Sequence, residues 1–189
     1  MTIKNNDHHL SLGETTDFLT GETIADSHDE RYRQKIAKLL VHECGFDRSM
    51  IDKATPLIIH VGGRKSSIKV DFLVRVGGRI SMVIKYNPGS IVTRRQTCLA
   101  LSRIIAPYQI PVAVMTNGED AEIIDGNTGE VTANGLARMP GSESLDAIAS
   151  AHPFEPLPDK TVELASRIVQ ACEVDGACPC DTDVCVIED

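Results

Sequence analysis

Two neighbouring stretches decide the fold: Ser67–Val76, which reads SIKVDFLVRV, and Ile80–Tyr86, which reads ISMVIKY. Both are rich in β-branched and other apolar residues, and Gly77-Gly78 between them predicts the turn of a β-hairpin. A two-residue turn sets Val74 against Ser81, so that apolar side chains meet polar ones along the ladder. A three-residue loop that includes Arg79 instead aligns four apolar pairs on one face. Because a slip of one residue turns every side chain to the opposite face, the pattern favours the three-residue loop. The aligned pairs are then Val70–Tyr86, Phe72–Ile84, Val74–Met82 and Val76–Ile80.

The other face of this hairpin sets Asp71 directly opposite Lys85, near the end of two strands. An acid and a lysine placed in this way are positioned to act together on one substrate. A plain cross-strand ion pair explains the same placement and contributes about 0.2–1 kcal/mol. The hairpin alone therefore does not distinguish a functional site from a structural pair.

The sequence around the hairpin predicts a mixed α/β (α+β) fold, with a central mixed sheet of about four or five strands flanked by helices. Helical periodicity covers 28–44 and 160–172, and a helix over 91–106 begins after Ser90 and stops at Pro107. Further strands are expected at 56–61, 111–116 and 121–125. We expect three regions: a mobile N-terminal segment (1–27), a core domain (28–141), and a C-terminal helix with an acidic, cysteine-rich tail (142–189).

Composition excludes several classes of protein. The chain has 189 residues, of which 42% are hydrophobic and 24% charged, as in a globular domain and unlike a disordered chain. Aromatic residues are 4%, too few for a single-strand binder that stacks bases on exposed rings. The sequence shows no apolar run of about 20 residues and no secretory signal, so we expect no membrane partner and a cytoplasmic location.

Charge is divided unevenly along the chain. Residues 60–103 carry nine basic side chains and one acidic side chain, Asp71, whereas residues 104–189 carry three basic and sixteen acidic ones. A basic block attracts phosphate, and an acidic block repels it. Two oppositely charged surfaces that keep the protein in solution are the simpler interpretation. Charge alone favours this simpler interpretation, and the single carboxylate inside the basic block makes Asp71 a residue of interest.

Four cysteines gather near the C-terminus: Cys172, Cys178, Cys180 and Cys185. Four thiolates suffice for a tetrahedral Zn²⁺ site or an Fe–S cluster. The spacing C-x5-C-x-C-x4-C differs from the common C-x2-C knuckle, and a tail with reduced thiols is the competing interpretation.

Several short motifs in a specific order resemble a known family. They are His42–Phe46 at the end of the first helix, the strand Lys69–Val74, the strand end Ile84–Pro88, Gln96 in the next helix, and Ala113–Gly118. From Tyr32 to about Gly141 the chain resembles the N-terminal domain of type I restriction enzyme R subunits, in a stand-alone form. That family belongs to the PD-(D/E)xK nuclease superfamily, so the resemblance implies a restriction-endonuclease-like core.

The resemblance also implies roles for particular residues. Asp71 and the acid of an E-x-K unit would bind Mg²⁺ or Mn²⁺, Lys85 would position the attacking water and stabilise the phosphorane, and Glu43 would complete the site. Gln96, Arg94 and Arg95 would lie near the phosphate path. Two positions depart from the family pattern: the E-x-K unit reads Val83-Ile84-Lys85, and the family's Gln-x-x-x-Tyr helix reads Gln96 to Ala100. Valine offers Mg²⁺ no oxygen ligand.

Three functions therefore compete. The first is metal-dependent phosphodiester hydrolysis of DNA by a site with a degraded E-x-K motif. The second is a non-catalytic module of the same fold that binds nucleic acid, with DNA favoured over RNA, or a protein partner. The third is a regulatory protein that binds metal through its cysteine tail. Val83 favours the second over the first, and the basic block keeps nucleic acid as the expected partner of both.

Overall fold

The computed structural model describes residues 12–176 and 184–187. Its centre is a mixed sheet in the order β3-β4-β5-β6-β7-β8, with β9 paired to β4. Neighbouring strands are antiparallel except β5 and β6, which are parallel. The mixed α/β class is confirmed, with more strands than the four or five expected. The strands are β3 (Ile51–Val61), β4 (Arg64–Val76), β5 (Arg79–Tyr86), β6 (Val112–Thr116), β7 (Ala121–Asp125), β8 (Val131–Asn134) and β9 (Val184–Ile187).

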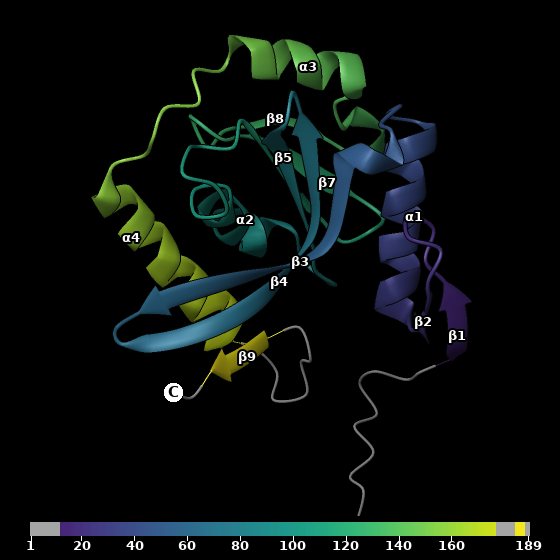
Figure 1. The fold of residues 1–189 in the computed structure, drawn as a ribbon, viewed down its shortest axis with the longest axis horizontal. Helices are drawn as coiled ribbons and strands as arrows, with labels where there is room; N and C mark the ends of the chain where they lie inside the picture. Colours follow the sequence, from purple (N-terminus) through teal and green to yellow (C-terminus); the bar gives the residue numbers. More distant parts are fainter. Residues whose placement is uncertain (1–11, 177–183, 188–189) are drawn as a thin grey trace, which may run out of the picture.

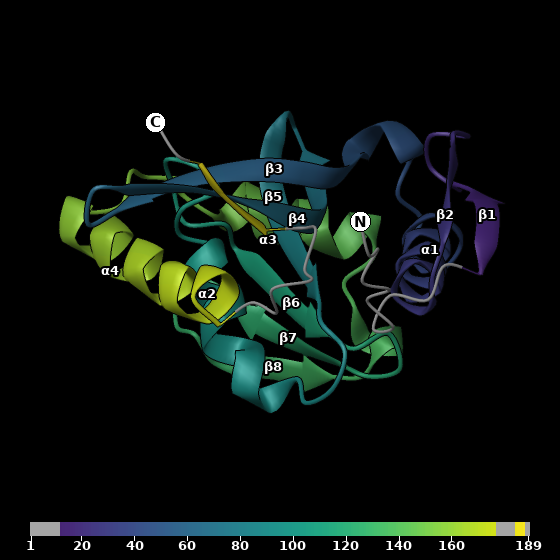
Figure 2. The same ribbon diagram turned by 90° about the horizontal axis from the view of Figure 1, so that it is seen from below.

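Helices cover both faces of the sheet (Figures 1 and 2). The first face packs against α1 (His28–His42) and α3 (Ser142–Ala151), and its core includes Leu40, Phe72 and Leu145. The second face packs against α2 (Arg95–Leu101) and α4 (Asp159–Val169), and its core includes Leu73 and Cys98. The sheet is thus the middle layer of a sandwich, in agreement with the long apolar runs of its central strands.

Local sequence signals set the bounds of α1. Ser27 caps its N-terminus, because the Ser27 hydroxyl accepts a hydrogen bond from the backbone N–H of Glu30 at 3.1 Å. Ile36, Ala37 and Leu40 repeat with helical spacing and are buried. Gly45, with φ +74°, follows the C-terminal end. The helix expected over 28–44 is therefore present almost in full.

The register of the central hairpin is confirmed in its middle and differs at its turn. Phe72 pairs with Ile84 and Val74 with Met82, as predicted. Gly77 and Gly78 both have positive φ, which suits a two-residue turn, and the register then shifts by one residue between Val74 and Arg75. A β-bulge, rather than a third loop residue, thus produces the one-residue change of register. It places Arg75, rather than Val76, opposite Ile80.

The expected single apolar face of this hairpin is also wrong at two positions. Val70 and Ile80 belong to the core beside α2, whereas Phe72, Val74 and Met82 belong to the core beside α1. The bulge accounts for Ile80. Beside Val70, the neighbouring strand β3 has a left-handed residue, Ala54 with a φ of +52°, between the pairs Lys53–Phe72 and Thr55–Val70.

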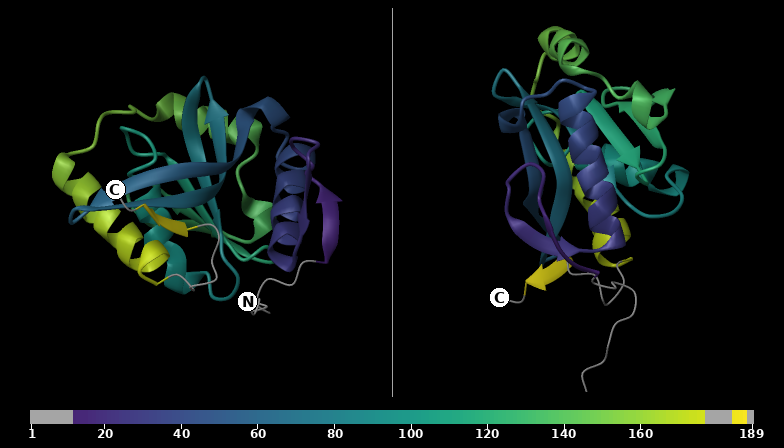
Figure 3. Two further views of the ribbon diagram at one scale, coloured as in Figure 1. Left: turned by 60° about the horizontal axis from the view of Figure 1, so that its bottom comes forward. Right: turned by 90° about the vertical axis from the view of Figure 1, so that its right-hand side faces the viewer.

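The N-terminal segment was expected to be mobile over residues 1–27, but its described part is folded. Residues 13–16 and 23–26 form the antiparallel strands β1 (Gly13–Thr16) and β2 (Thr23–Asp26), which lie beside α1 (Figure 3). The buried Asp17 accepts hydrogen bonds within the connection between these strands and from Gln34 and Lys53, and Phe18 and Leu19 of the same connection pack against the core. Residues 1–11 lie outside the described residues.

Other bounds differ for physical reasons as well. The helix expected over 91–106 is reduced to a 3₁₀ turn (Val92–Arg94) and α2. Beyond α2, the Ser102 carbonyl accepts a hydrogen bond from the N–H of Ile110 at 3.0 Å instead of continuing the helix. The sequence set residues 142–189 apart from the core, but α3, α4 and β9 all pack on the same sheet. Pro56 has no backbone N–H to donate to a neighbouring strand, and it is tolerated in β3 because β3 is an edge strand.

Helix α1 docks on the turn between β6 and β7 through close contacts. The Lys35 ammonium donates to the Gly118 carbonyl at 2.8 Å, and the Tyr32 hydroxyl donates to Glu119 at 2.9 Å. Gly118 has a φ of +84°, and a Cβ there would lie 2.3 Å from Cδ1 and 2.8 Å from Cβ of Tyr32. The ring cannot swing away from a clash so close to its own backbone, so this position requires glycine.

We expect Gly118→Ala to lower the free energy of unfolding by about 2–4 kcal/mol, from overpacking and from left-handed strain together. The matched control is Gly89→Ala, because Gly89 also has a positive φ, +98°, but open space at its Cβ position. The control should cost about 1 kcal/mol from strain alone. Urea denaturation of both variants measures the difference, and equal losses would contradict the proposed clash.

Candidate functional site

The hairpin brings Asp71 and Lys85 together, as the sequence predicts. The Lys85 ammonium lies 3.6 Å from Asp71 Oδ2, and both side chains are buried. The same carboxylate is held twice more: Oδ2 accepts the backbone N–H of Tyr86 at 2.9 Å, and Oδ1 accepts Arg33 Nε at 2.7 Å. Asp71 therefore joins α1, β4 and β5 at one point.

A second carboxylate reaches this cluster from the C-terminal part of the chain. Glu173 lies in the π-helical turn η4 (Gln170–Val174) that follows α4. Its Oε2 lies 3.2 Å from the Lys85 ammonium, and its Oε1 lies 3.8 Å from Arg94 Nη1. Burial alone would lower the pKa of Lys85, but the Asp71 and Glu173 carboxylates outweigh it and raise that pKa above its usual value. Lys85 is thus a fixed cation at neutral pH and cannot serve as a general base.

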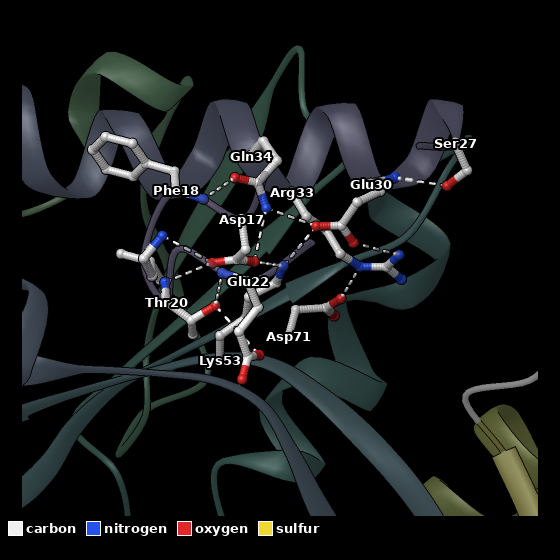
Figure 4. Close-up of polar contacts among 11 residues, drawn as sticks. Asp17, Phe18, Thr20, Glu22, Ser27, Glu30, Arg33, Gln34, Lys53 and Asp71 are labelled. Carbon is white, nitrogen blue, oxygen red and sulfur yellow. Dashed lines mark hydrogen bonds and ion pairs between the residues drawn. The ribbon is translucent and has the colours of Figure 1, made fainter. Parts of the chain in front are cut away.

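A network of buried polar groups extends from Arg33 along α1 (Figure 4). The Lys53 ammonium lies between the carboxylates of Asp17 and Glu30, 2.6 Å from Glu30 Oε1. Gln34 Nε2 donates to the same two acids. Arg33 Nη1 in turn lies 4.0 Å from Glu30 Oε2. The N-terminal hairpin is thereby connected to Asp71 through charged side chains of α1 and β3.

A cavity of about 320 Å³ opens beside this network. Three cations (Arg33, Lys53 and Lys69) and two acids (Glu30 and Asp71) line it. Ala54, with its left-handed backbone, lines the same cavity across from Asp71. A strained non-glycine residue costs about 1–2 kcal/mol and is found most often where a site needs a particular shape.

Glu43 does not join the site. It follows α1 as its C-terminal cap and lines a different groove, beside Lys38 and His42. The contact between α1 and Asp71 is made at Arg33, ten residues earlier, which is about 15 Å along a helix. Glu30 is the carboxylate of α1 that faces Arg33 and the cavity near Asp71. Glu43, which the family resemblance suggested, lies at the C-terminal end of α1, whereas the site lies towards the N-terminal end of the helix.

The residues present do not fit a divalent metal. Val83, at the position of the missing acid, is fully buried in the apolar core beside Leu73 and Cys98. Both oxygens of Asp71 already accept hydrogen bonds, and Lys85 stands between Asp71 and Glu173. Within residues 12–176 and 184–187, no three His, Cys, Asp or Glu side chains group closely enough to hold an ion. Mg²⁺ needs several hard oxygen ligands, and protein cations fill their place here.

The basic block is largely neutralised by acids from distant parts of the chain. Arg95 makes a bidentate pair with Glu122, at 2.6 and 2.7 Å. Arg94 donates to the Cys172 carbonyl at 3.0 Å in addition to its contact with Glu173. Gln96, the third residue expected to meet phosphate, is exposed. These arginines have structural partners, so their presence alone does not mark a nucleic-acid surface.

The four cysteines of the expected metal site are only partly described. Cys172 is a free, partly exposed thiol in η4, and Cys185 lies opposite Ser67 in the pairing of β9 with β4. Cys178 and Cys180 lie outside the described residues. The Zn²⁺ or Fe–S site therefore stays a prediction.

A family model for the N terminus of type I restriction enzyme R proteins matches residues 28–140, which is more than half of the chain. The chain belongs to this family. The resemblance noted in the sequence is thereby confirmed, and α1, α2 and the strands β3 to β8 are the matched part of this R-protein N-terminal domain. The match ends before α3, so Glu173 belongs to a C-terminal extension of the family domain.

No curated protein and no solved structure matches the chain. Among the described helices, none has the length and apolar character that a membrane crossing requires.

Sequence reasoning missed three residues of the site. Arg33 and Glu30 stand three positions apart on one face of the expected helix, which is a weak signal for a shared ion pair. Glu173 carried no signal, because nothing local indicates that residue 173 returns to residue 85. Contacts of this kind follow from the packing of α4 and not from any motif.

The buried cluster and an exposed ion pair on the same hairpin provide a direct comparison. Lys85→Met leaves Asp71 and Glu173 without their shared cation, so we expect a loss of about 3–5 kcal/mol in the free energy of unfolding. Arg75→Met breaks the pair with Asp52, whose two side chains are 40% and 39% exposed, and should cost about 1 kcal/mol or less. Urea denaturation measures both, and a loss of similar size in the two variants would argue against the buried cluster.

Asp17 should make the protein sensitive to acid. Burial would raise its pKa, but hydrogen bonds from Lys53, Thr20 and Gln34 lower it to about 2 from 3.8. A lowered pKa stabilises the fold above the unfolded value, and that contribution is lost as the pH falls from about 4 to about 2. This contribution to the free energy of unfolding amounts to about 2 kcal/mol. Asp17→Asn should therefore be less stable than wild type at pH 6, and the difference in the free energy of unfolding between the two proteins should narrow towards pH 2. A gap that stays constant over this range would contradict the assignment.

Proposed function

We propose that this domain binds the phosphate backbone of DNA at the Asp71–Lys85 end of the sheet and does not hydrolyse it. One observation carries the loss of hydrolysis: Asp71 is occupied by Arg33 and a backbone N–H, and Val83 supplies no second metal ligand. Metal-dependent hydrolysis requires a bound cation to activate water and to neutralise the developing charge. The protein cations at this place suit the binding of a negatively charged ligand better than the binding of a metal ion.

Membership of a restriction enzyme family and the local charge both support DNA as the ligand. The cavity beside Asp71 is lined by one more cation than acids, and the exposed Lys69 is one of these cations. Backbone phosphates are bound chiefly by Lys and Arg, with release of counterions. Because most arginines of the basic block are paired within the protein, the interaction should be of modest strength and should depend strongly on salt.

The test combines binding and cleavage. Wild-type protein should bind a short fluorescent DNA duplex at low salt, and its affinity should fall steeply as salt rises. Lys69→Ala should weaken DNA binding. It should also reduce the slope of the logarithm of the binding constant against the logarithm of the salt concentration by about 1, because one phosphate contact is lost. Lys160→Ala, which removes an exposed lysine on α4, is the matched control and should change little.

In the same preparation, supercoiled plasmid should remain intact with Mg²⁺ or Mn²⁺, and it should remain equally intact with an Asp71→Ala control. Nicking that Asp71→Ala abolishes would contradict this proposal and support the hydrolytic function that the family resemblance implies, with Mg²⁺ or Mn²⁺ as cofactor. Absence of DNA binding at low salt would favour a protein partner instead.

A further inference from the structure

The Glu173 carboxylate lies beside Lys85 and Arg94, where an external anion could also bind. It comes from the extension beyond the matched residues 28–140, on a π-helical turn in which the N–H of Asp175 donates to the Gln170 carbonyl at 2.9 Å. Single π turns in helices are frequent at functional positions. The carboxylate is 8% exposed and meets two basic side chains from different elements, Lys85 of β5 and Arg94 ahead of α2.

The charge balance of the cluster depends on this one carboxylate. Asp71 divides its charge between Arg33 and Lys85, so Glu173 is the second acid beside Lys85 and the acid that meets Arg94. Without the Glu173 carboxylate, the positive charges of Lys85 and Arg94 would be only partly neutralised by nearby acids. A backbone phosphodiester carries the same single negative charge on oxygen acceptors and would restore the balance.

Two buried polar atoms lie where the segment that carries Glu173 meets the sheet. Gln170 Oε1 in η4 and Ser66 Oγ in β4, beside β9, are buried without a hydrogen-bond partner in the described part of the chain. Each such group costs about 1–3 kcal/mol. On the outside, Asp175 pairs with Arg64, but both side chains are about half exposed, so this pair adds little. Detachment of the segment would relieve these defects.

We propose that Lys85 and Arg94 form a binding site for one DNA backbone phosphate, and that Glu173 occupies this site until the C-terminal segment (η4 with β9) detaches. The inference rests on the proposed DNA-binding function and adds an intramolecular competitor to it. DNA and Glu173 then exclude each other, so the closed segment lowers DNA affinity by mass action.

Two variants of the full-length chain test the competition with a short fluorescent DNA duplex. Glu173→Gln removes the competing charge and should bind DNA about tenfold more tightly than wild type. The matched control is Glu163→Gln, which removes an exposed acid from α4 and changes the net charge equally. Equal gains in the two variants would show a general charge effect and overturn the proposal.

The second variant closes the segment covalently. Ser67→Cys places a thiol opposite Cys185, where oxidation can form a cross-strand disulfide, identified by peptide mapping. The oxidised variant should bind DNA about tenfold more weakly than wild type treated with the same oxidant, and reduction should restore its binding. A mapped disulfide without effect on binding would overturn the competition while leaving DNA binding intact. If no variant binds DNA at low salt, both the proposed function and this inference are wrong.

Discussion

The carboxylate of Asp71 is the point on which the architecture of the site depends. One oxygen accepts a hydrogen bond from the guanidinium of Arg33 and the other accepts one from the backbone N–H of Tyr86, so a single side chain fixes α1 against the middle of β4 and the C-terminal end of β5. Arg33 also lies over the ring of Tyr86, at 5.3 Å from its centroid, and Tyr86 stacks on Tyr32 of α1. A buried acid with this many partners cannot be exchanged for a neutral residue without leaving cations unpaired.

Around this point the chain pairs opposite charges that are far apart in the sequence. Arg95 meets Glu122, Lys85 meets Glu173, and Lys53 meets Asp17. The basic block and the acidic C-terminal part therefore do not form two separate surfaces, as the sequence alone suggests. Where the family resemblance implies a bound metal ion, this chain holds a network of protein cations and acids. Membership of the family therefore does not by itself assign metal chemistry to this chain.

The sequence predicted the parts of the fold that repeat with a local period. The core residues of α1, the middle register of the central hairpin and the Asp71–Lys85 pair all follow from alternation or helical spacing within about 20 residues. The sequence did not predict elements that depend on polar contacts between distant residues, such as the β1–β2 hairpin, where Asp17 contacts Gln34 and Lys53. It also did not predict the end of the helix that begins at Arg95, where the Ser102 carbonyl accepts a hydrogen bond from the N–H of Ile110. Glu173 belongs to the same class, because its position is set by α4 packing on the sheet.

The long-range pairing of charges has a consequence for the chain while it is being made. Residues 1–59 carry a net charge of −3 and residues 60–103 a net charge of +8, so residues 1–103 together carry a net charge of about +5. Residues 1–189 together have a net charge of −8, and Glu122 and Glu173, which partner Arg95, Arg94 and Lys85, are translated after residue 103. A fragment of residues 1–103 therefore has the opposite sign of charge to the 189 residues together. Such a fragment should be retained by a cation exchanger that lets the 189-residue chain pass.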